Sequence, residues 1–330
     1  MLGLVFVALI VTWSLYNAVT RTTPFFNVLL IGLTQGCVYA LVALGYTLVY
    51  GILQLINFAH GDVFALSGLF ASTMVGGAVF GLTSSSTTFG LIGGLTATFI
   101  IAAAFGAIVN SSIEFLAYRR LRNAPRLSVL ITAVGMSFIV QNISLAVYDV
   151  NARSIPQLIP GTDLIHVGGV SYTWDAFFVI VVTAPVLVVL SWLVKSTKHG
   201  KAMRATSQDP EAAAIMGINV NRTITFTFAL AGALAGVGAT LYLVEFNIRY
   251  DTGFTLGLIA FTAAVLGGIG NLTGAVLGAI IIGLIQAFNE GPFLDAPGSD
   301  WTKTLVFTIL IMILVFRPEG LLGERTPEGA

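Results

Sequence analysis

The sequence predicts an all-α integral membrane protein, a polytopic bundle of about ten transmembrane helices in one domain spanning residues 1–330. Of the 330 residues, 56% are hydrophobic and only 9% are charged, and the mean hydropathy is +0.94. Soluble domains carry roughly 25% charged residues, so these charges are too few to cover a globular surface of this size. The apolar residues also gather in runs as long as a bilayer-spanning helix.

The predicted spans follow from these apolar runs, each close to the roughly 20 residues that cross a bilayer. The first run lacks a basic leading segment and a small-x-small cleavage site, which favours an uncleaved span over a signal peptide. Segment 45–80 fits either two plain spans or a broken, re-entrant helix, and the outer interval 149–174 is expected to hold a short re-entrant or amphipathic piece. The spans are 2–19, 26–50, 58–79, 90–117, 127–148, 175–194, 223–244, 253–269, 273–288 and 302–316.

Basic residues orient the predicted bundle. When the polar interval 195–222 is placed in the cytoplasm, its five basic residues, four arginines of 119–126 and two in the tail face inside, against four outside. This asymmetry is what the positive-inside rule expects. Both termini are then cytoplasmic, and the cytoplasmic tail 317–330 is expected to be polar and mobile.

A short, well-delimited helix is predicted within the interval 195–222. Asp209 can accept hydrogen bonds from backbone N–H groups as an N-cap, and Pro210 suits the first helical position. Glu211 complements the positive end of the helix dipole. Alanines follow, and Gly217 is placed to end the helix in a left-handed conformation. So much local specification indicates that this cytoplasmic loop has a task.

Polar residues interrupt the apolar stretch 45–68 at Asn57, His60 and Asp62. Polar groups near membrane depth are costly unless they are paired or face water, which makes them candidates for a translocation path. The alternative is a structural helix-to-helix turn at the inner surface, with Asp62 capping the next helix. No third ligand lies near His60 and Asp62 in the sequence, so no metal site is predicted.

A second candidate for the path lies in the stretch 261–279, where glycines including Gly268 and Gly270 crowd around Asn271. Short hydrophobic segments interrupted by glycine at corresponding places in two halves point to a transport site. A plain tight hairpin is an equal alternative.

Glycines four residues apart recur in several spans and predict close helix packing. Two such pairs open spans of opposite direction in the two halves of the chain, as an inverted repeat would place them. The pairs are Gly32 with Gly36 and Gly232 with Gly236.

Missing motifs narrow the function. The sequence has no phosphate-cradling G-x-x-x-x-G-K-[ST] loop, no H-E-x-x-H and no serine nucleophile elbow, which argues against an ATPase or a membrane hydrolase. The spans also hold no ladder of carboxylates, since Glu114 and Glu245 fall near span ends, whereas proton- or sodium-coupled carriers usually need acids deep inside. No basic tail or aromatic-basic stripe suggests nucleic acid.

Three stretches, at 36–62, 204–222 and 260–279, together resemble the permease subunit of branched-chain amino-acid ABC importers, closest to its LivH type. The resemblance extends from about residue 26 to residue 320. Glu211-Ala212-Ala213-x-x-x-Gly217 also resembles the E-A-A-x-x-x-G coupling motif of ABC import permeases, although the downstream part of that motif is not evident. The resemblance implies ATPase-coupling residues Arg204, Asp209, Pro210, Glu211, Ala212, Ala213 and Gly217.

The resemblance further implies a type II-like permease in the inner (plasma) membrane that imports branched-chain or related neutral amino acids. Expected partners are a second permease of the LivM type, two cytoplasmic ATPases of the LivF and LivG type that bind ATP and Mg, and an extracytoplasmic binding protein. No cofactor and no catalytic residue is expected in this chain. The alternatives are an ABC permease for urea or amides, and a stand-alone facilitator or secondary carrier. The translocation-path residues expected are Asn57, His60, Asp62, Gly268, Gly270 and Asn271.

Overall fold

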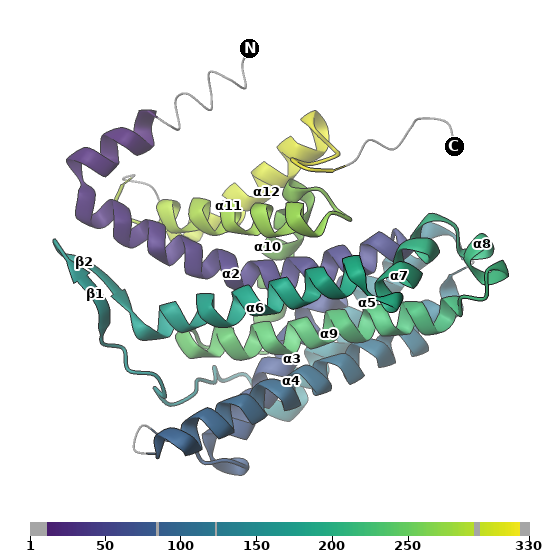
Figure 1. The fold of residues 1–330 in the computed structure, drawn as a ribbon, viewed down its shortest axis with the longest axis horizontal. Coiled ribbons are helices and arrows are strands. Elements are labelled where there is room, and N and C mark those ends of the chain that lie inside the picture. The colour runs from purple at the N-terminus through teal and green to yellow at the C-terminus, as the bar shows by residue number, and fades with distance from the viewer. Residues whose placement is uncertain (1–11, 84–85, 123, 294–297, 324–330) are drawn as a thin grey trace.

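The computed structural model describes residues 12–83, 86–122, 124–293 and 298–323, and most of these residues lie in helices (Figure 1). The bundle consists of α2 (Thr22–Leu53), α3 (Ala59–Thr73), α4 (Thr88–Leu116), α5 (Arg126–Tyr148), α6 (Trp174–Ser196), α9 (Val220–Glu245), α10 (Thr252–Gly267), α11 (Leu272–Glu290) and α12 (Ser299–Phe316). Two short helices, α7 (Lys198–Gln208) and α8 (Pro210–Ile215), stand at one end.

Each predicted span after the first has its helix, but the helices differ in length. Within the described residues, α2, α4, α5, α6, α9, α11 and α12 are long and apolar enough to cross a membrane, whereas α10 is a shorter apolar helix. Helix α3 has 15 residues and continues into a π-helical turn at Met74–Ala78. Residues 2–11 of the predicted first span 2–19 lie outside the described part of the chain, and the described residues 12–20 are helical.

Within the interval 149–174, residues 163–173 form a β-hairpin and no helix precedes the start of α6 at Trp174, so the expected re-entrant or amphipathic piece is wrong. Strand β1 (Asp163–Val167) pairs antiparallel with β2 (Val170–Thr173). Gly168 and Gly169 join them with φ values of +60° and +84°. Such left-handed conformations suit a two-residue hairpin turn and favour glycine. The hairpin marks one end of the bundle, here called the hairpin end, and α8 marks the opposite, α8 end (Figure 1).

Helices α2 and α9 form the centre of the bundle. Helix α2 packs along α11, α9 packs along α4, and α2 and α9 also contact each other. Exchanging α2 with α9, α3 with α10, α4 with α11 and α5 with α12 turns the main contacts among these eight helices into other contacts that are present. The weaker α2–α3 and α11–α12 contacts have no counterpart of similar extent. The contacts α3–α9 and α2–α10, for example, exchange with each other. The two halves of the chain therefore pack by one scheme.

Glycines make the two central crossings close, as their four-residue spacing predicts. A Cβ atom at Gly36 of α2 would lie 2.8 Å from the Cα atom of Ile280 in α11. A Cβ atom at Gly236 of α9 would lie 2.9 Å from the Cα atom of Ala103 in α4. Both distances are shorter than a side chain tolerates, so the helices approach backbone to backbone.

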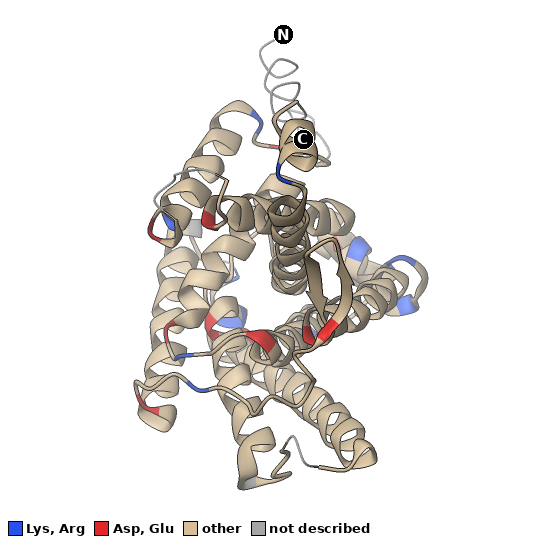
Figure 2. Ribbon diagram, turned by 90° about the vertical axis from the view of Figure 1, so that its left-hand side faces the viewer, with Lys and Arg blue, Asp and Glu red and all other residues tan. Residues whose placement is uncertain are grey.

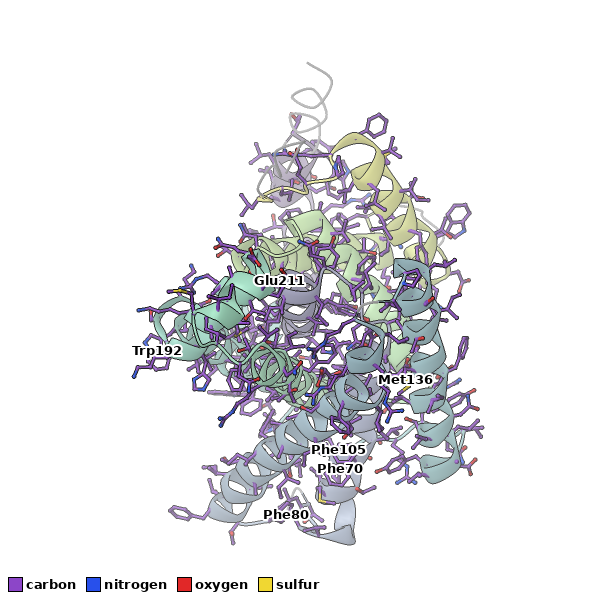
Figure 3. The ribbon with its side chains drawn as sticks, turned by 90° about the vertical axis from the view of Figure 1, so that its right-hand side faces the viewer. Phe70, Phe80, Phe105, Met136, Trp192 and Glu211 are labelled. Carbon is purple, nitrogen blue, oxygen red and sulfur yellow. The ribbon has the colours of Figure 1, made fainter. Side chains whose placement is uncertain are left out.

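The peripheral helices α5, α6 and α12 expose apolar side chains. Trp192 of α6 projects from the edge of the bundle, whereas Phe70 of α3 and Phe105 of α4 are half-buried and stack on each other with ring centroids 4.2 Å apart (Figure 3). Seen from the hairpin end, charged residues are sparse along the ribbon (Figure 2). An apolar exterior with few charges is the surface of a protein that faces lipid.

Candidate functional site

The predicted helix in the polar interval 195–222 is present as α8, and its start is confirmed in detail. The Asp209 carboxylate accepts hydrogen bonds from the backbone N–H groups of Glu211 (2.9 Å) and Ala212 (3.0 Å). Pro210 occupies the first helical position, where no N–H group is needed. The cap fixes the direction in which α8 leaves α7.

The end of α8 is equally defined. Gly217 has a φ of +84°, and its N–H group donates to the Ala214 carbonyl (3.0 Å) while that of Ile218 donates to the Ala213 carbonyl (3.0 Å). This is a left-handed glycine cap, as predicted. The last turn presents Ile215, which is 86% exposed, and Met216 beside it, which is 82% exposed. The α8 end therefore carries an apolar tip, which the sequence prediction did not single out.

Arg204 fixes α7 against the preceding span. Its guanidinium donates to the backbone carbonyls of Val194 and, at 3.3 Å, of Lys195, which lie in the last turn of α6. A cation at a helix C-terminus also interacts favourably with the helix dipole. Arg204 is thus tied to α6, whereas Asp209 and Glu211 are exposed on α8 (Figure 3 labels Glu211).

Helix α8 is joined almost directly to the centre of the bundle. Asn219, two residues after Gly217, caps α9 by accepting from the N–H group of Arg222 (3.0 Å). Helix α9 contacts α2, α3 and α4. A displacement of α8 would therefore act on the first turn of α9 with only a short linker between them.

A buried ion cluster, here the Glu114 cluster, ties that first turn of α9 to α4. The Glu114 carboxylate is fully buried and forms ion pairs with Arg119 (3.2 Å) and Arg122. It also accepts from the Thr225 hydroxyl of α9 (2.8 Å), and Arg122 donates to the side chain of Asn221. Sequence reasoning placed Glu114 near a span end but missed the cluster, although arginines five and eight residues later were a signal.

Asn57 belongs to a second buried network at the α8 end. Its amide donates to the Asn110 side chain (3.1 Å), and its carbonyl accepts from the Tyr118 hydroxyl (3.1 Å). Asn110 in turn donates to the backbone carbonyl of Phe228 in α9 (2.7 Å). The network joins the α2–α3 connection, α4 and α9, so Asn57 holds helix ends together.

His60 and Asp62 are buried between helices. The His60 ring lies edge-on to Tyr46, with centroids 4.9 Å apart, and covers Gly45. Asp62 accepts a hydrogen bond from Ser137 of α5. The predicted helix-to-helix turn is present, but the expected cap is wrong, because α3 begins at Ala59 and Asp62 lies inside its first turn.

Gly268, Gly270 and Asn271 form a tight turn between α10 and α11. The two glycines have φ values of +108° and +96°, and Asn271 caps α11 by accepting from Gly274 N–H (3.0 Å). Gly51 near the end of α2 approaches Gly270, so the structure brings the stretches 45–68 and 261–279 together at the α8 end. None of the six path candidates lines the cavity between α2, α9, α10 and α11 that is described below.

The start of the C-terminal tail packs on this turn. Leu321 and Leu322 donate backbone N–H groups to the carbonyls of Leu266 (2.8 Å) and Gly267 (2.9 Å), and Asn271 donates to the Leu322 carbonyl (2.8 Å). The expected mobile tail is therefore wrong for residues 317–323. Residues 324–330 of the predicted tail lie outside the described part of the chain.

These features define a polytopic helical membrane protein that presents a capped helix at one end of its bundle. The profile of the family described as "Branched-chain amino acid transport system / permease component" matches residues 28–315. The chain belongs to this family. It is a permease, a transport subunit and not itself an ATPase.

Curated relatives match along nearly their whole length. The chain is 38% identical over 304 residues to the high-affinity branched-chain amino acid transport system permease protein BraD of Pseudomonas aeruginosa, covering 90% of this chain and 95% of that protein. It is 35% identical over 302 residues to the permease protein LivH of Salmonella typhimurium, with the same coverage. Among solved structures, a chain described as a metal-chelate type ABC transporter in an inward-facing conformation aligns with a TM-score of 0.51 at 17% identity, covering 94% of this chain and 97% of that one. The last comparison shows a shared fold alone.

Proposed function

We propose that this chain is the membrane-spanning subunit of an ATP-driven importer for branched-chain or related neutral amino acids, and that α8 couples it to ATPase partners. The observation that carries the proposal is the exposed, capped α8 with its apolar tip. Ile215 and Met216 offer a side-chain pair that a groove on another protein would bury. The nearby charge of Glu211 would set the orientation of α8 in the partner's groove more than it would raise the affinity for the partner.

The route from α8 into the bundle supports this coupling role. Arg204 anchors α7 to the end of α6, and Asn219 starts α9 directly after α8. ATP binding and hydrolysis in the partners would shift α8 and thereby α9, which changes the population of two arrangements of the bundle. Pro210 at the first helical position and the helix-forming Ala212 and Ala213 would keep the transmitting helix stiff between its caps.

We propose that the chain crosses the inner membrane about ten times, with α3 and α10 counted among the crossings. The α8 end and both termini then face the cytoplasm. Basic residues gather at this end in 119–126 and 195–222. The opposite end, with the β-hairpin, would meet an extracytoplasmic binding protein. A second permease of the LivM type would cover part of the apolar flank, and two ATPases with ATP and Mg would bind below.

The exchange of contacts between α2–α5 and α9–α12 supports an inverted repeat of the type II-like kind. In such a repeat the translocation path lies between the halves. The buried positions of His60 and Asp62 would then be packing positions beside the path, and Gly268, Gly270 and Asn271 would form a hinge or a closed turn at its inner end. An importer for urea or amides remains the alternative cargo class, and a stand-alone carrier the alternative mechanism.

The test uses the complete importer with its ATPases and binding protein in proteoliposomes. Glu211→Lys and Gly217→Trp should insert normally but lose leucine uptake while ATP hydrolysis continues. Glu211→Asp, which keeps the negative charge in the first turn of α8, serves as the control and should leave hydrolysis coupled to uptake. Unchanged coupled uptake in both α8 variants would refute the coupling role, and leucine transport by the lone chain in liposomes would establish a carrier instead.

A further inference from the structure

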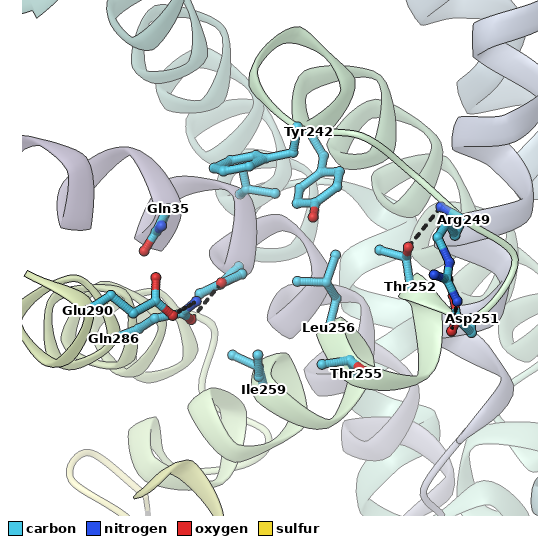
Figure 4. A pocket seen from close by; sticks show the side chains of 13 residues that line it. Gln35, Tyr242, Arg249, Asp251, Thr252, Thr255, Leu256, Ile259, Gln286 and Glu290 are labelled. Carbon is cyan, nitrogen blue, oxygen red and sulfur yellow. Dashed lines mark hydrogen bonds and ion pairs between the residues drawn. The ribbon is translucent and has the colours of Figure 1, made fainter. Parts of the chain in front are cut away.

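A cavity of about 380 Å³ opens at the hairpin end between α2, α9, α10 and α11 (Figure 4). Its volume lies near the lower end of the roughly 300–1,000 Å³ typical of small-molecule sites. Val38, Leu256 and Ile259 give it an apolar wall, and all three are buried. Its polar groups lie on two sides, which is the arrangement of a site that orients a ligand.

One side of the cavity has unused capacity to accept hydrogen bonds. Gln35 of α2 is only 9% exposed, and its side-chain carbonyl oxygen has no hydrogen-bond partner within the described residues. The Glu290 carboxylate of α11 lies on the same side (Figure 4). It accepts from Gln286 (3.0 Å) and Thr302 (2.8 Å), and no cation pairs with it in the described part of the chain. Leaving a buried acceptor unbonded is costly, so a bound cation with N–H donors would be stabilised here.

The other side of the cavity carries hydrogen-bond donors. Arg249 lies at the rim, half-exposed, and pairs with Asp251 at 2.7 Å. The hydroxyl groups of Tyr242 and Thr255 also line the cavity and make no hydrogen bond to any described residue. Figure 4 places Tyr242 and Thr255 between the Gln35–Glu290 side and Arg249. These groups suit a carboxylate held in the middle of the cavity, attracted by the guanidinium at the rim.

From this arrangement we infer a binding site of the permease itself for the zwitterion of an amino acid with an aliphatic side chain. The ammonium group lies between the Gln35 carbonyl and the Glu290 carboxylate, and the carboxylate lies toward Tyr242 and Thr255. The aliphatic side chain packs on Leu256 and the apolar wall beside it. This inference rests on the proposed function, and it adds that the permease selects its cargo after the binding protein has released it.

The test measures binding of radiolabelled L-leucine to the purified full-length chain in lipid nanodiscs, without ATPases. Unlabelled 4-methylpentanoate, which is leucine without its ammonium group, competes in a parallel series. Glu290→Gln and Gln35→Leu should lower the preference for leucine over 4-methylpentanoate about tenfold or more, the effect of losing one charge-assisted hydrogen bond. A general loss of structure would weaken both ligands alike and would not change this ratio.

Glu245→Gln is the matched control, because Glu245 also ends a span at the hairpin end but lines a separate depression. It should keep the wild-type ratio. Glu290 lies at an exposed helix end, so its variant tests the site even if Gln35→Leu does not fold. Wild-type protein that binds no leucine, or ratios unchanged in both variants, would overturn the inference. The complete importer distinguishes the two ideas: continued coupled leucine uptake with no binding to the permease alone leaves the proposed function standing.

Discussion

Substituting alanine for Gly36 should separate the central helix α2 from α11, which packs along it. The added Cβ atom would lie 2.8 Å from the Ile280 Cα atom and 3.2 Å from the Ala279 carbonyl oxygen. Both neighbours are backbone atoms, so no side chain can rotate away, and one helix must move by several tenths of an ångström. Overpacking of this kind costs about 1–3 kcal/mol.

Gly135→Ala in α5 provides the matched reference. Nothing lies within 4 Å of a Cβ atom at Gly135, which sits in the exposed part of that helix. Both substitutions gain the same helix propensity, about 1 kcal/mol, so the difference between them isolates the strain at the crossing. We expect Gly36→Ala to be less stable than Gly135→Ala by about 1–3 kcal/mol.

Unfolding of the two purified variants in mixed detergent micelles, followed by circular dichroism against denaturant fraction, gives the comparison. A difference of 1.4 kcal/mol corresponds to about tenfold in the unfolding equilibrium constant, which such titrations resolve. Equal stability of the two variants would mean that α2 and α11 adjust freely, and the argument for a rigid backbone-to-backbone crossing would fail.

Two further predictions concern the α8 end. Glu114→Gln leaves Arg119 and Arg122 without their shared carboxylate and should destabilise the chain by about 2–3 kcal/mol. This is below the roughly 3–5 kcal/mol of a fully buried pair, because both arginines keep some water. Thermal unfolding measures the loss, and an equally large loss in an Arg122→Gln background would contradict the ion-pair explanation. Asn271→Ala removes the bond to the Leu322 carbonyl and the α11 cap, so the amides of Leu321 and Leu322 should exchange hydrogen faster by mass spectrometry. Unchanged exchange there would show that the tail does not depend on Asn271.

The positions of the bundle helices from α2 onward could be predicted because long apolar runs mark them, although α3 and α10 are shorter than the spans expected there. The α8 helix was predictable for a different reason: Asp209, Pro210 and Gly217 act on neighbours within a few residues, so their effect is visible in sequence. Helix α7 was missed, although Thr197 caps it by accepting from Gly200 N–H (3.1 Å). Its polar composition resembles a loop, and its position depends on Arg204 reaching back to α6, a contact that no local pattern specifies.

Site residues were harder to predict, because their roles depend on partners far along the chain. Asn57 was a reasonable candidate as a polar group in an apolar stretch, but its partners Asn110 and Tyr118 lie 53 and 61 residues away. Only the fold shows that it is bonded inside the protein. Gln35 went unnoticed for the opposite reason: a single amide in a long apolar run gives no signal until the cavity in front of it is known.

An amide followed four residues later by a carboxylate lies near the end of a helix at both ends of the bundle, but the two pairs have different partners. Helix α4 ends with an amide and, four residues later, a carboxylate, Asn110 and Glu114; helix α11 ends likewise with Gln286 and Glu290. The contact exchange pairs these two helices. At the α8 end the amide is bonded to Asn57 and the carboxylate is held by arginines, whereas at the hairpin end both groups line a cavity. Asn221 and Thr225 of the Glu114 cluster lie in the first turns of α9, directly after α8. A shift of α8, which we propose as the coupling element, would therefore act on this cluster and open the bonds that hold α4 and α9 together at the α8 end.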